Sequence, residues 1–441
     1  MATTELHISK NNVVALSQAL SDPPWYAAHR LAAWEVFEGT PMPTLNDDPW
    51  RRTNLAGFKW GTAVLPSQAI LQPQPNGHGG AARIPAALTK PLAGKIVGGQ
   101  LVRSGGKTAS YHLDPALRAQ NIIFTDFLNA ARQYPDLVQK YLSTAVRASE
   151  GKFAALAETL VDDGLFVYVP RNAQVTLPLH FVAWLTGPAH FNRVVIAVDE
   201  GAALTLVQEW ASPKSKTPAL HAATVEALVG ANAHLTLVEL QSLGRNVWNF
   251  VHERVRVARD ATVDWITAAI GSRLTKNFSE VDLEGMGATA KVSGFYFADE
   301  NQHFDYDTQQ NHMVPHTTSD LLFKGAVKDQ SHSVWQGMIY VAPGAQKTDG
   351  YQANRNLVLS KTARADALPG LEILNDDVRC SHGATVGQME EDHIFYLMSR
   401  GLYRAEAERL AVSGFFEPVM DRIPFEGVRQ RLRKAIEEKM E

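Results

Sequence analysis

A short phrase of sequence occurs four times in the middle of the chain, and it constrains the fold more than any other feature. It lies at residues 201–206, 231–237, 260–265 and 287–292, and each copy is a short apolar strand introduced by Gly, Ala, Asp or Asn. Superposing the last three residues of the copies gives offsets of 31, 28 and 27 residues. An all-strand repeat of this length predicts stacked coils, each of which buries its face on the next.

A parallel β-helix fits these coils best, and an ordinary β-sandwich is the alternative because strand spacing alone does not fix topology. We expect the β-helix core over residues 161–386. Residues 1–160 are expected to be mostly helical, with a mobile Pro/Gly loop at 71–80. Helices are expected again over residues 387–441. The fold class is therefore mainly β, with a solenoid flanked by helical regions.

Apolar spacing locates several helices in the flanking regions. At the N-terminal end it predicts one helix around residues 13–20 and a second from about Trp25 to Phe37. At the C-terminal end, residues 394–398 form an apolar helical face. The following helix is expected to end at a Ser413-Gly414 C-cap.

Charge and motifs exclude several classes of function. A formal net charge of -4 gives no signature of a nucleic-acid-binding protein. No apolar run reaches about 18 residues, so no membrane span is expected, and the first residues do not look like a secretory signal. The Gly106-Lys107-Thr108 segment lacks the first glycine of a phosphate loop, and no Cys-x-x-Cys or His-Glu-x-x-His motif occurs.

The only cysteine of the chain, Cys380, stands two residues before His382. If residues 378–382 form a strand, both side chains project to the same face. Such a pair suits a nucleophile with its base, or half of a metal site. Two ligands do not hold a metal centre alone, so the missing partners must come from elsewhere in this chain or from another chain. A single thiol in a chain of this length also fits a reducing compartment.

A second polar cluster lies between residues 302 and 316 and includes His303, Asp305, Asp307 and His312. Imidazole and carboxylate groups at this density suggest a metal site. Their spacing matches no specific metal-binding template, so structural or interface roles are favoured over metal binding.

Long phrases of the chain resemble the SufB/SufD family of iron–sulfur cluster assembly proteins, and their order matches as well. The resemblance is dense from about residue 151 to 416, and the segment after Cys380 is more similar to SufD members than to SufB members. The phrases are Lys-Thr-Asp-Gly at 347–350, Asn-Arg-Asn-Leu at 354–357, Pro-Gly-Leu-Glu-Ile at 369–373, Cys-Ser-His-Gly-Ala-Thr-Val-Gly at 380–387 and Phe-Tyr-Leu-Met-Ser-Arg-Gly at 395–401, with Pro-Met-Pro at 41–43 and Trp-Arg-Arg-Thr at 50–53.

The resemblance implies a right-handed parallel β-helix and a scaffold without catalytic activity of its own. It implies pairing with SufB through the C-terminal part of the β-helix and docking of the ATPase SufC on the C-terminal helices. An iron–sulfur cluster would form transiently at the SufB interface, with His382 as a candidate ligand and Cys380 as a less secure one. The isolated chain would hold no cofactor tightly and would form a homodimer, and the expected compartment is the cytoplasm or the plastid stroma.

Two enzyme classes compete with this interpretation. A thiol hydrolase or transferase would use Cys380 with His382, but positions i and i+2 of a strand project in parallel, and no third orienting group is evident. A β-helix polysaccharide lyase would normally be exported. For Cys380 a role as a small buried hydrophobic residue is a further alternative, and for His382 a hydrogen-bonded interface histidine is another.

Overall fold

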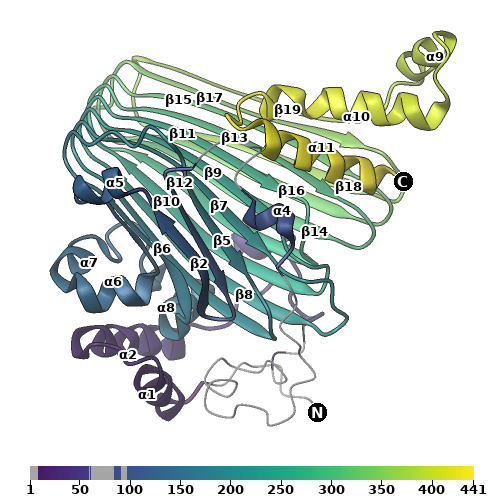
Figure 1. Ribbon diagram of the computed structural model, residues 1–441. Helices are drawn as coiled ribbons and strands as arrows, with labels where there is room; N and C mark the ends of the chain where they lie inside the picture. Colours follow the sequence, from purple (N-terminus) through teal and green to yellow (C-terminus); the bar gives the residue numbers. More distant parts are fainter. Residues whose placement is uncertain (1–7, 59, 61–83, 91–96) are drawn as a thin grey trace.

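Two long β-sheets stacked face to face form the body of the protein, with helices on their outer faces (Figure 1). The computed structural model describes residues 8–58, 60, 84–90 and 97–441. The Pro/Gly loop expected at 71–80 lies outside these residues.

The described elements are mainly strands in the middle of the chain and helices towards its ends. The helices are α1 (Lys10–Ala19), α2 (Pro24–Gly39), the 3-10 turn η1 (Asp48–Trp50), α4 (Ala86–Thr89), α5 (Pro115–Ala119), α6 (Phe127–Gln133), α7 (Pro135–Tyr141), η4 (Ala148–Glu150), α8 (Lys152–Leu160), α9 (Glu391–Ser399), α10 (Arg404–Met420) and α11 (Glu426–Met440). No helix among the described residues has the length and apolar character needed to cross a bilayer.

The strands are β1 (Gly99–Ser104), β2 (Lys107–Leu113), β3 (Ile123–Thr125), β4 (Asp163–Val169), β5 (Leu179–Trp184), β6 (Ala189–Val198), β7 (Ala203–Ala211), β8 (Ala219–Val229), β9 (His234–Ser242), β10 (Val247–Val257), β11 (Thr262–Ala269), β12 (Leu274–Leu283), β13 (Thr289–Ala298), β14 (His303–His312), β15 (Thr318–Val327), β16 (His332–Val341), β17 (Thr348–Val358), β18 (Arg364–Ile373) and β19 (Val378–Gln388).

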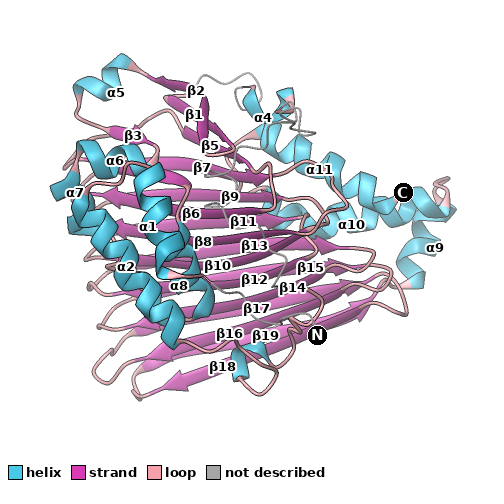
Figure 2. Cartoon of the chain, turned by 90° about the horizontal axis from the view of Figure 1, so that it is seen from below, coloured by secondary structure: helices cyan, strands magenta, loops and turns pink. Residues whose placement is uncertain are grey.

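Successive strands alternate between the two sheets, which makes the body a solenoid (Figure 2). From β5 to β19 the odd-numbered strands form one sheet, and from β4 to β18 the even-numbered strands form the other, with every neighbouring pair parallel. The sixteen strands from β4 to β19 therefore make eight turns. The predicted parallel β-helix is confirmed, and the sandwich alternative is wrong.

Pairing in the odd sheet matches the offsets of the sequence repeat. Leu206 pairs with Leu237, Leu237 with Trp265, and Trp265 with Val292. These are the last residues of the four copies, so superposing the copies had already given the strand register.

The repeated phrase also contains the corner of each coil. Asn232 and Asp260 have positive φ angles of 57° and 55°, and Gly201 and Gly287 take the same conformation at 69° and 76°. The corners stack through backbone hydrogen bonds, such as that from Asn232 N–H to the Arg259 carbonyl oxygen at 2.9 Å. Gly, Asn and Asp recur here because they tolerate the left-handed region.

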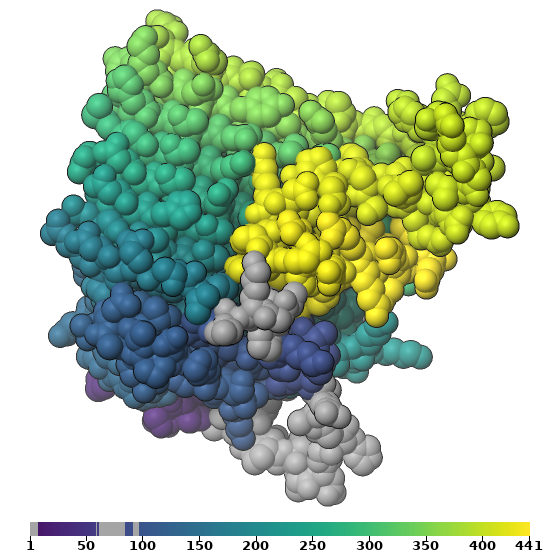
Figure 3. All heavy atoms as spheres, turned by 45° about the horizontal axis from the view of Figure 1, so that its top comes forward, coloured from purple at the N-terminus to yellow at the C-terminus, as the bar shows by residue number. Residues whose placement is uncertain are grey.

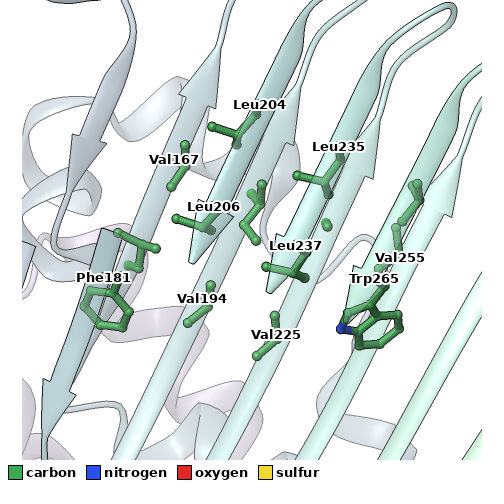
Figure 4. Close-up of a cluster of buried hydrophobic side chains, with 14 of the residues drawn as sticks. Val167, Phe181, Val194, Leu204, Leu206, Val225, Leu235, Leu237, Val255 and Trp265 are labelled. Atoms are coloured by element: carbon green, nitrogen blue, oxygen red, sulfur yellow. The ribbon is translucent and has the colours of Figure 1, made fainter. Parts of the chain in front are cut away.

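The core lies between the sheets and consists of columns of apolar side chains (Figure 4). On the odd sheet, Leu204 and Leu206 lie beneath Leu235 and Leu237, and all four are at most 1% exposed. Full burial of such a side chain contributes about 1.5–3 kcal/mol. Each coil needs a neighbour to bury its column, so the solenoid is stabilised coil by coil.

Helices α1, α2 and α8 cover the outer face of the even sheet. Phe153 of α8 stacks on Phe250 of β10 with ring centroids 3.8 Å apart, and Trp50 packs against both rings. Arg193 of β6, fully buried, ion-pairs with Glu158 of α8 and Glu226 of β8.

The C-terminal helices α10 and α11 cover the outer face of the odd sheet, as the yellow segment of Figure 3 shows. Phe416 of α10 packs against Phe295 of β13 with ring centroids 5.0 Å apart. The predicted C-cap at Ser413-Gly414 is wrong, because α10 continues to Met420. Gly414 is an exposed position inside the helix with no atom near its missing Cβ.

Strands β1, β2 and β3 were not predicted within the first 160 residues. The β1–β2 hairpin extends the odd sheet beyond β5, and β3 extends the even sheet beyond β4, with β2 and β3 each pairing antiparallel to its neighbour. At the opposite end of the solenoid, β18 and β19 are the last strands of their sheets.

Two glycine substitutions test the corner and the helix. Gly287→Ala should lower the free energy of unfolding by about 1–3 kcal/mol, because a non-glycine residue is strained at a φ of 76° and its Cβ would lie 2.2 Å from Asp260 Oδ1. Gly414→Ala should raise it by about 0.5–1 kcal/mol, as expected inside a helix. Urea unfolding followed by circular dichroism measures both. A loss of stability in the second variant would restore the C-cap assignment.

Candidate functional site

Both predicted site residues lie on β19, the last strand of the odd sheet. β19 pairs with β17 from Thr348↔Val378 to Val358↔Gln388, and within the described ranges no strand pairs with its other edge. The strand predicted over residues 378–382 is confirmed. Because positions i and i+2 share a face, Cys380 and His382 project to the same side with their Cα atoms about 6.6 Å apart.

That side is the inward face, where the core columns of earlier coils lie. The register aligns Cys380 with a column that runs back to Leu204, and His382 with one that runs back to Leu206. The two columns, read towards β19, are Leu204, Leu235, Val263, Ala290, Ser319, Gly350 and Cys380, and Leu206, Leu237, Trp265, Val292, Leu321, Gln352 and His382. The Cys-Ser-His segment therefore occupies the place that Leu-Thr-Leu holds in an inner coil.

Cys380 is half-buried beside a small apolar cluster that contains Ile339 and Val341. Gly350, its register partner, leaves room for the sulfur, since a Cβ there would lie 3.3 Å from Cys380 Sγ. Burial raises the pKa of the Cys380 thiol. A hydrogen bond with the Gly350 backbone opposes part of this effect, and the nearby Asp349 carboxylate adds a smaller upward shift, so that the pKa remains raised. The thiol therefore stays protonated at neutral pH, unlike a catalytic nucleophile.

His382 is exposed at the open end of the solenoid. Its register partner Gln352 is fully buried and donates a hydrogen bond of 2.8 Å to the Gly370 carbonyl oxygen of β18. Across the part of the chain that the structure describes, no hydrogen bond or ion pair engages the His382 imidazole. Its nitrogens are free to bind a ligand that approaches along the axis of the solenoid.

Cys380 and His382 do not complete a metal site by themselves. Among the described residues, no group of three or more His, Cys, Asp or Glu side chains is placed to hold a metal ion.

The second polar cluster has structural roles. The buried Lys276 ammonium pairs with Asp305 and Asp307 at 2.9 Å each. His312 is hydrogen-bonded to Thr317 and Ser319, and burial lowers its pKa to about 4, so the ring is neutral. His316 occupies a left-handed corner with a φ of 59°. Structural roles were favoured for this cluster, and these contacts supply them.

An exposed apolar surface that we did not predict lies on α9 and the start of α10. Its members, here called the α9–α10 patch, are Phe395, Tyr396, Met398, Tyr403 and Leu410, which are 72%, 57%, 41%, 80% and 53% exposed. Spacing predicted an apolar helical face over 394–398, and only Ile394 of these residues is buried. Helix α9 projects from the body (Figures 1 and 3), and the Arg404 guanidinium ties it to α10 through Glu391. Apolar patches of this kind mark interaction sites.

Family models match most of the chain from residue 107 onward. The model described as "SUF system FeS cluster assembly, SufBD core domain" matches residues 182–415. The model described as "SufBD protein N-terminal region" matches residues 107–181.

Curated bacterial proteins are similar to this chain over nearly its whole length. "Iron-sulfur cluster assembly protein SufD" of Bacillus subtilis is 31% identical over 444 residues, which cover 99% of each chain. An "Iron-sulfur cluster assembly SufBD family protein" of Staphylococcus saprophyticus is 28% identical, over 96% of this chain and 91% of its own length. A protein of the same description from Staphylococcus epidermidis is 29% identical with the same coverage.

The raised pKa of Cys380 predicts slow alkylation of the folded chain. Iodoacetamide should react more slowly with folded protein than with urea-unfolded protein at pH 7–8, and the rate should reach half its maximum at a higher pH in the folded state. Mass spectrometry of the single thiol gives both profiles. A folded profile shifted to lower pH would contradict the assignment and favour a thiol-dependent enzyme.

Proposed function

The chain belongs to the SufBD family of iron–sulfur cluster assembly proteins, and we propose that it acts there as a SufD-type scaffold that pairs with SufB and docks the ATPase SufC. It is a non-catalytic member of the assembly system. We place it in the cytoplasm, because its bacterial relatives assemble iron–sulfur clusters and its single thiol suits a reducing compartment.

SufB pairs with the open end of the solenoid. The free edges of β18 and β19 offer unpaired backbone groups, which readily add strands from another chain. Leu371, Leu374 and Val386 beside these edges are 37%, 50% and 49% exposed. A partner with similar coils would cover the last columns and continue both sheets. Without SufB, a second copy of this chain fills the same role and gives a homodimer.

His382 contributes a ligand to a cluster that forms at this interface. The observation that carries the proposal is an exposed, unbonded imidazole on the inward face of the last strand. An iron–sulfur cluster takes about four protein ligands, so SufB must supply most of them. Cys380 lies on the same face, but its protonated, half-buried thiol makes it the weaker ligand. The cluster is cargo that forms transiently and leaves when the interface opens.

SufC docks on the α9–α10 patch. The patch is apolar and aromatic, as the centres of protein interfaces are, and α10 holds it firmly by packing on the odd sheet. Only Met389 and Glu390 separate α9 from β19. A partner bound to α9 is therefore only a few residues along the chain from β19, the strand that carries His382.

His382→Ala should leave the complex with SufB intact and lower its capacity to assemble clusters. Loss of the imidazole removes a direct ligand, so the effect should be at least the roughly tenfold loss of metal affinity typical of an outer-shell partner. Anaerobic reconstitution of the co-purified complex, followed by its visible absorbance, measures cluster content. Ser381→Ala on the opposite face of the same strand is the matched control. Wild-type cluster content in His382→Ala would show that the ligand assignment is wrong.

Phe395→Ala and Tyr403→Ala should each weaken SufC binding by about 1–3 kcal/mol, because large aromatic side chains carry much of the binding energy at interfaces. Calorimetric titration of the complete chain with SufC gives the affinity. Met286→Ala, which removes a 51% exposed side chain from a corner of the solenoid, is the control. Unchanged affinity in both aromatic variants would place SufC elsewhere.

A further inference from the structure

A cleft of about 760 Å³ opens at the side of the solenoid, where strands of the even sheet begin. The first residues of β12, β14 and β16 line it, together with the segments 52–57 and 215–218. Its volume lies in the range of small-molecule sites.

The described lining of the cleft carries positive charge. Arg52, Lys216, Arg245 and Arg273 line it, and no Asp or Glu is among the described lining residues. This excess stands out in a chain with a formal net charge of -4.

Two of the four cations have acidic partners outside the lining. The Arg245 guanidinium is paired with Asp299 at 2.6 Å and with Glu300 at 3.3 Å. Arg52 lies 3.9 Å from Asp366, a carboxylate that Arg364 and His332 already contact at 2.9 Å and 3.0 Å. Arg245 is therefore largely neutralised, whereas Arg52 is only weakly so.

Arg273 and Lys216 have no such partner. Within the described part of the chain, neither the Arg273 guanidinium nor the Lys216 ammonium makes a hydrogen bond or an ion pair, although Arg273 is half-buried. Burial lowers the pKa of Arg273 with no carboxylate to offset the effect. Charges removed from water are usually paired, so an unpaired guanidinium facing a cleft indicates a missing anion.

Further polar groups complete the site. Burial lowers the pKa of His303 to about 3, so its ring is neutral, and its Nε2 lies 2.8 Å from Thr53 Oγ1. The His332 ring lies edge-on to it, with centroids 4.9 Å apart. Asn54, Asn246 and Gln330 add amide groups at the rim.

We propose that this cleft binds a small molecule that carries a pyrophosphoryl group, with Arg273 and Lys216 as its principal cationic contacts and Arg52 as a third. A ligand with a single carboxylate needs fewer than three cationic contacts. Three cations from separate loops suit a ligand whose several phosphoryl oxygens are spread over two phosphorus atoms. The site is independent of the open end, since neither Cys380 nor His382 lines it.

Calorimetric titration of the complete chain with inorganic pyrophosphate at constant ionic strength tests the proposal. Saturable binding with one site is expected, at least tenfold tighter than that of phosphate or citrate. Arg273→Gln and Lys216→Gln should each weaken it at least tenfold. Arg171→Gln, which removes an exposed arginine paired with Glu200 outside the cleft, should leave it unchanged.

Folding of the variants is checked separately. Arg273→Gln should unfold at the same or a higher temperature than the wild type, because its guanidinium makes no bond to lose. If Arg273→Gln does not fold, the pyrophosphate affinity of Lys216→Gln, a substitution at an exposed position, tests the proposal. The proposal is wrong if pyrophosphate does not bind saturably, if citrate binds equally well, or if the cleft variants bind like the control.

Discussion

The register between successive parallel strands is the constraint on which the rest of this structure depends. Each coil presents inward residues on its odd strand, among them those of the Leu204 and Leu206 columns, and the neighbouring coils cover them. A solenoid of this kind has two ends, and at each end the inward residues of the terminal coil lack a neighbouring coil to cover them. At the N-terminal end, β3 and the β1–β2 hairpin extend the sheets and change strand direction. At the C-terminal end the last inward positions hold a thiol and an imidazole in place of leucines.

This substitution explains how a site arises without a pocket of its own. Along the column that ends at His382, the residues change from Leu321 through the amide of Gln352 to imidazole. The backbone positions remain those of a core, but the side chains face the place where a further coil would lie. In the proposed complex, a second protein that covers them would complete the core and the ligand set together. Separation of the two proteins would expose both again.

The sequence predicted the core of this fold well, because repeat spacing in a solenoid is the strand register. Offsets measured between Leu206, Leu237, Trp265 and Val292 recur as hydrogen-bonded pairings. It predicted the helical ends less well. Gly414 lies within α10 because packing of Phe416 and Val419 on the odd sheet overrides the weak helix propensity of glycine.

The site was predictable in part. Alternation along a strand predicted that Cys380 and His382 share a face. It did not predict which face that is, since either side of an edge strand can face inward. The α9–α10 patch could not be predicted from spacing, because a buried and an exposed apolar stripe have the same period. The cationic cleft combines residues as far apart in sequence as Arg52 and His332, and only the fold brings them together.

The free edge of β19 has a consequence for motion. In a stack stabilised by neighbours, an inner coil is held from two sides and the last coil from one, so local opening is easiest at the end. Among the strands that the structure describes, β19 pairs only with β17, and its residues are mostly exposed. β19, like β18 at the end of the other sheet, is thus a strand whose hydrogen bonds are expected to open more easily than those of the inner coils. A partner bound to β19 would slow that opening. The affinity for any cargo held at His382 would then depend on how well ordered this one strand is.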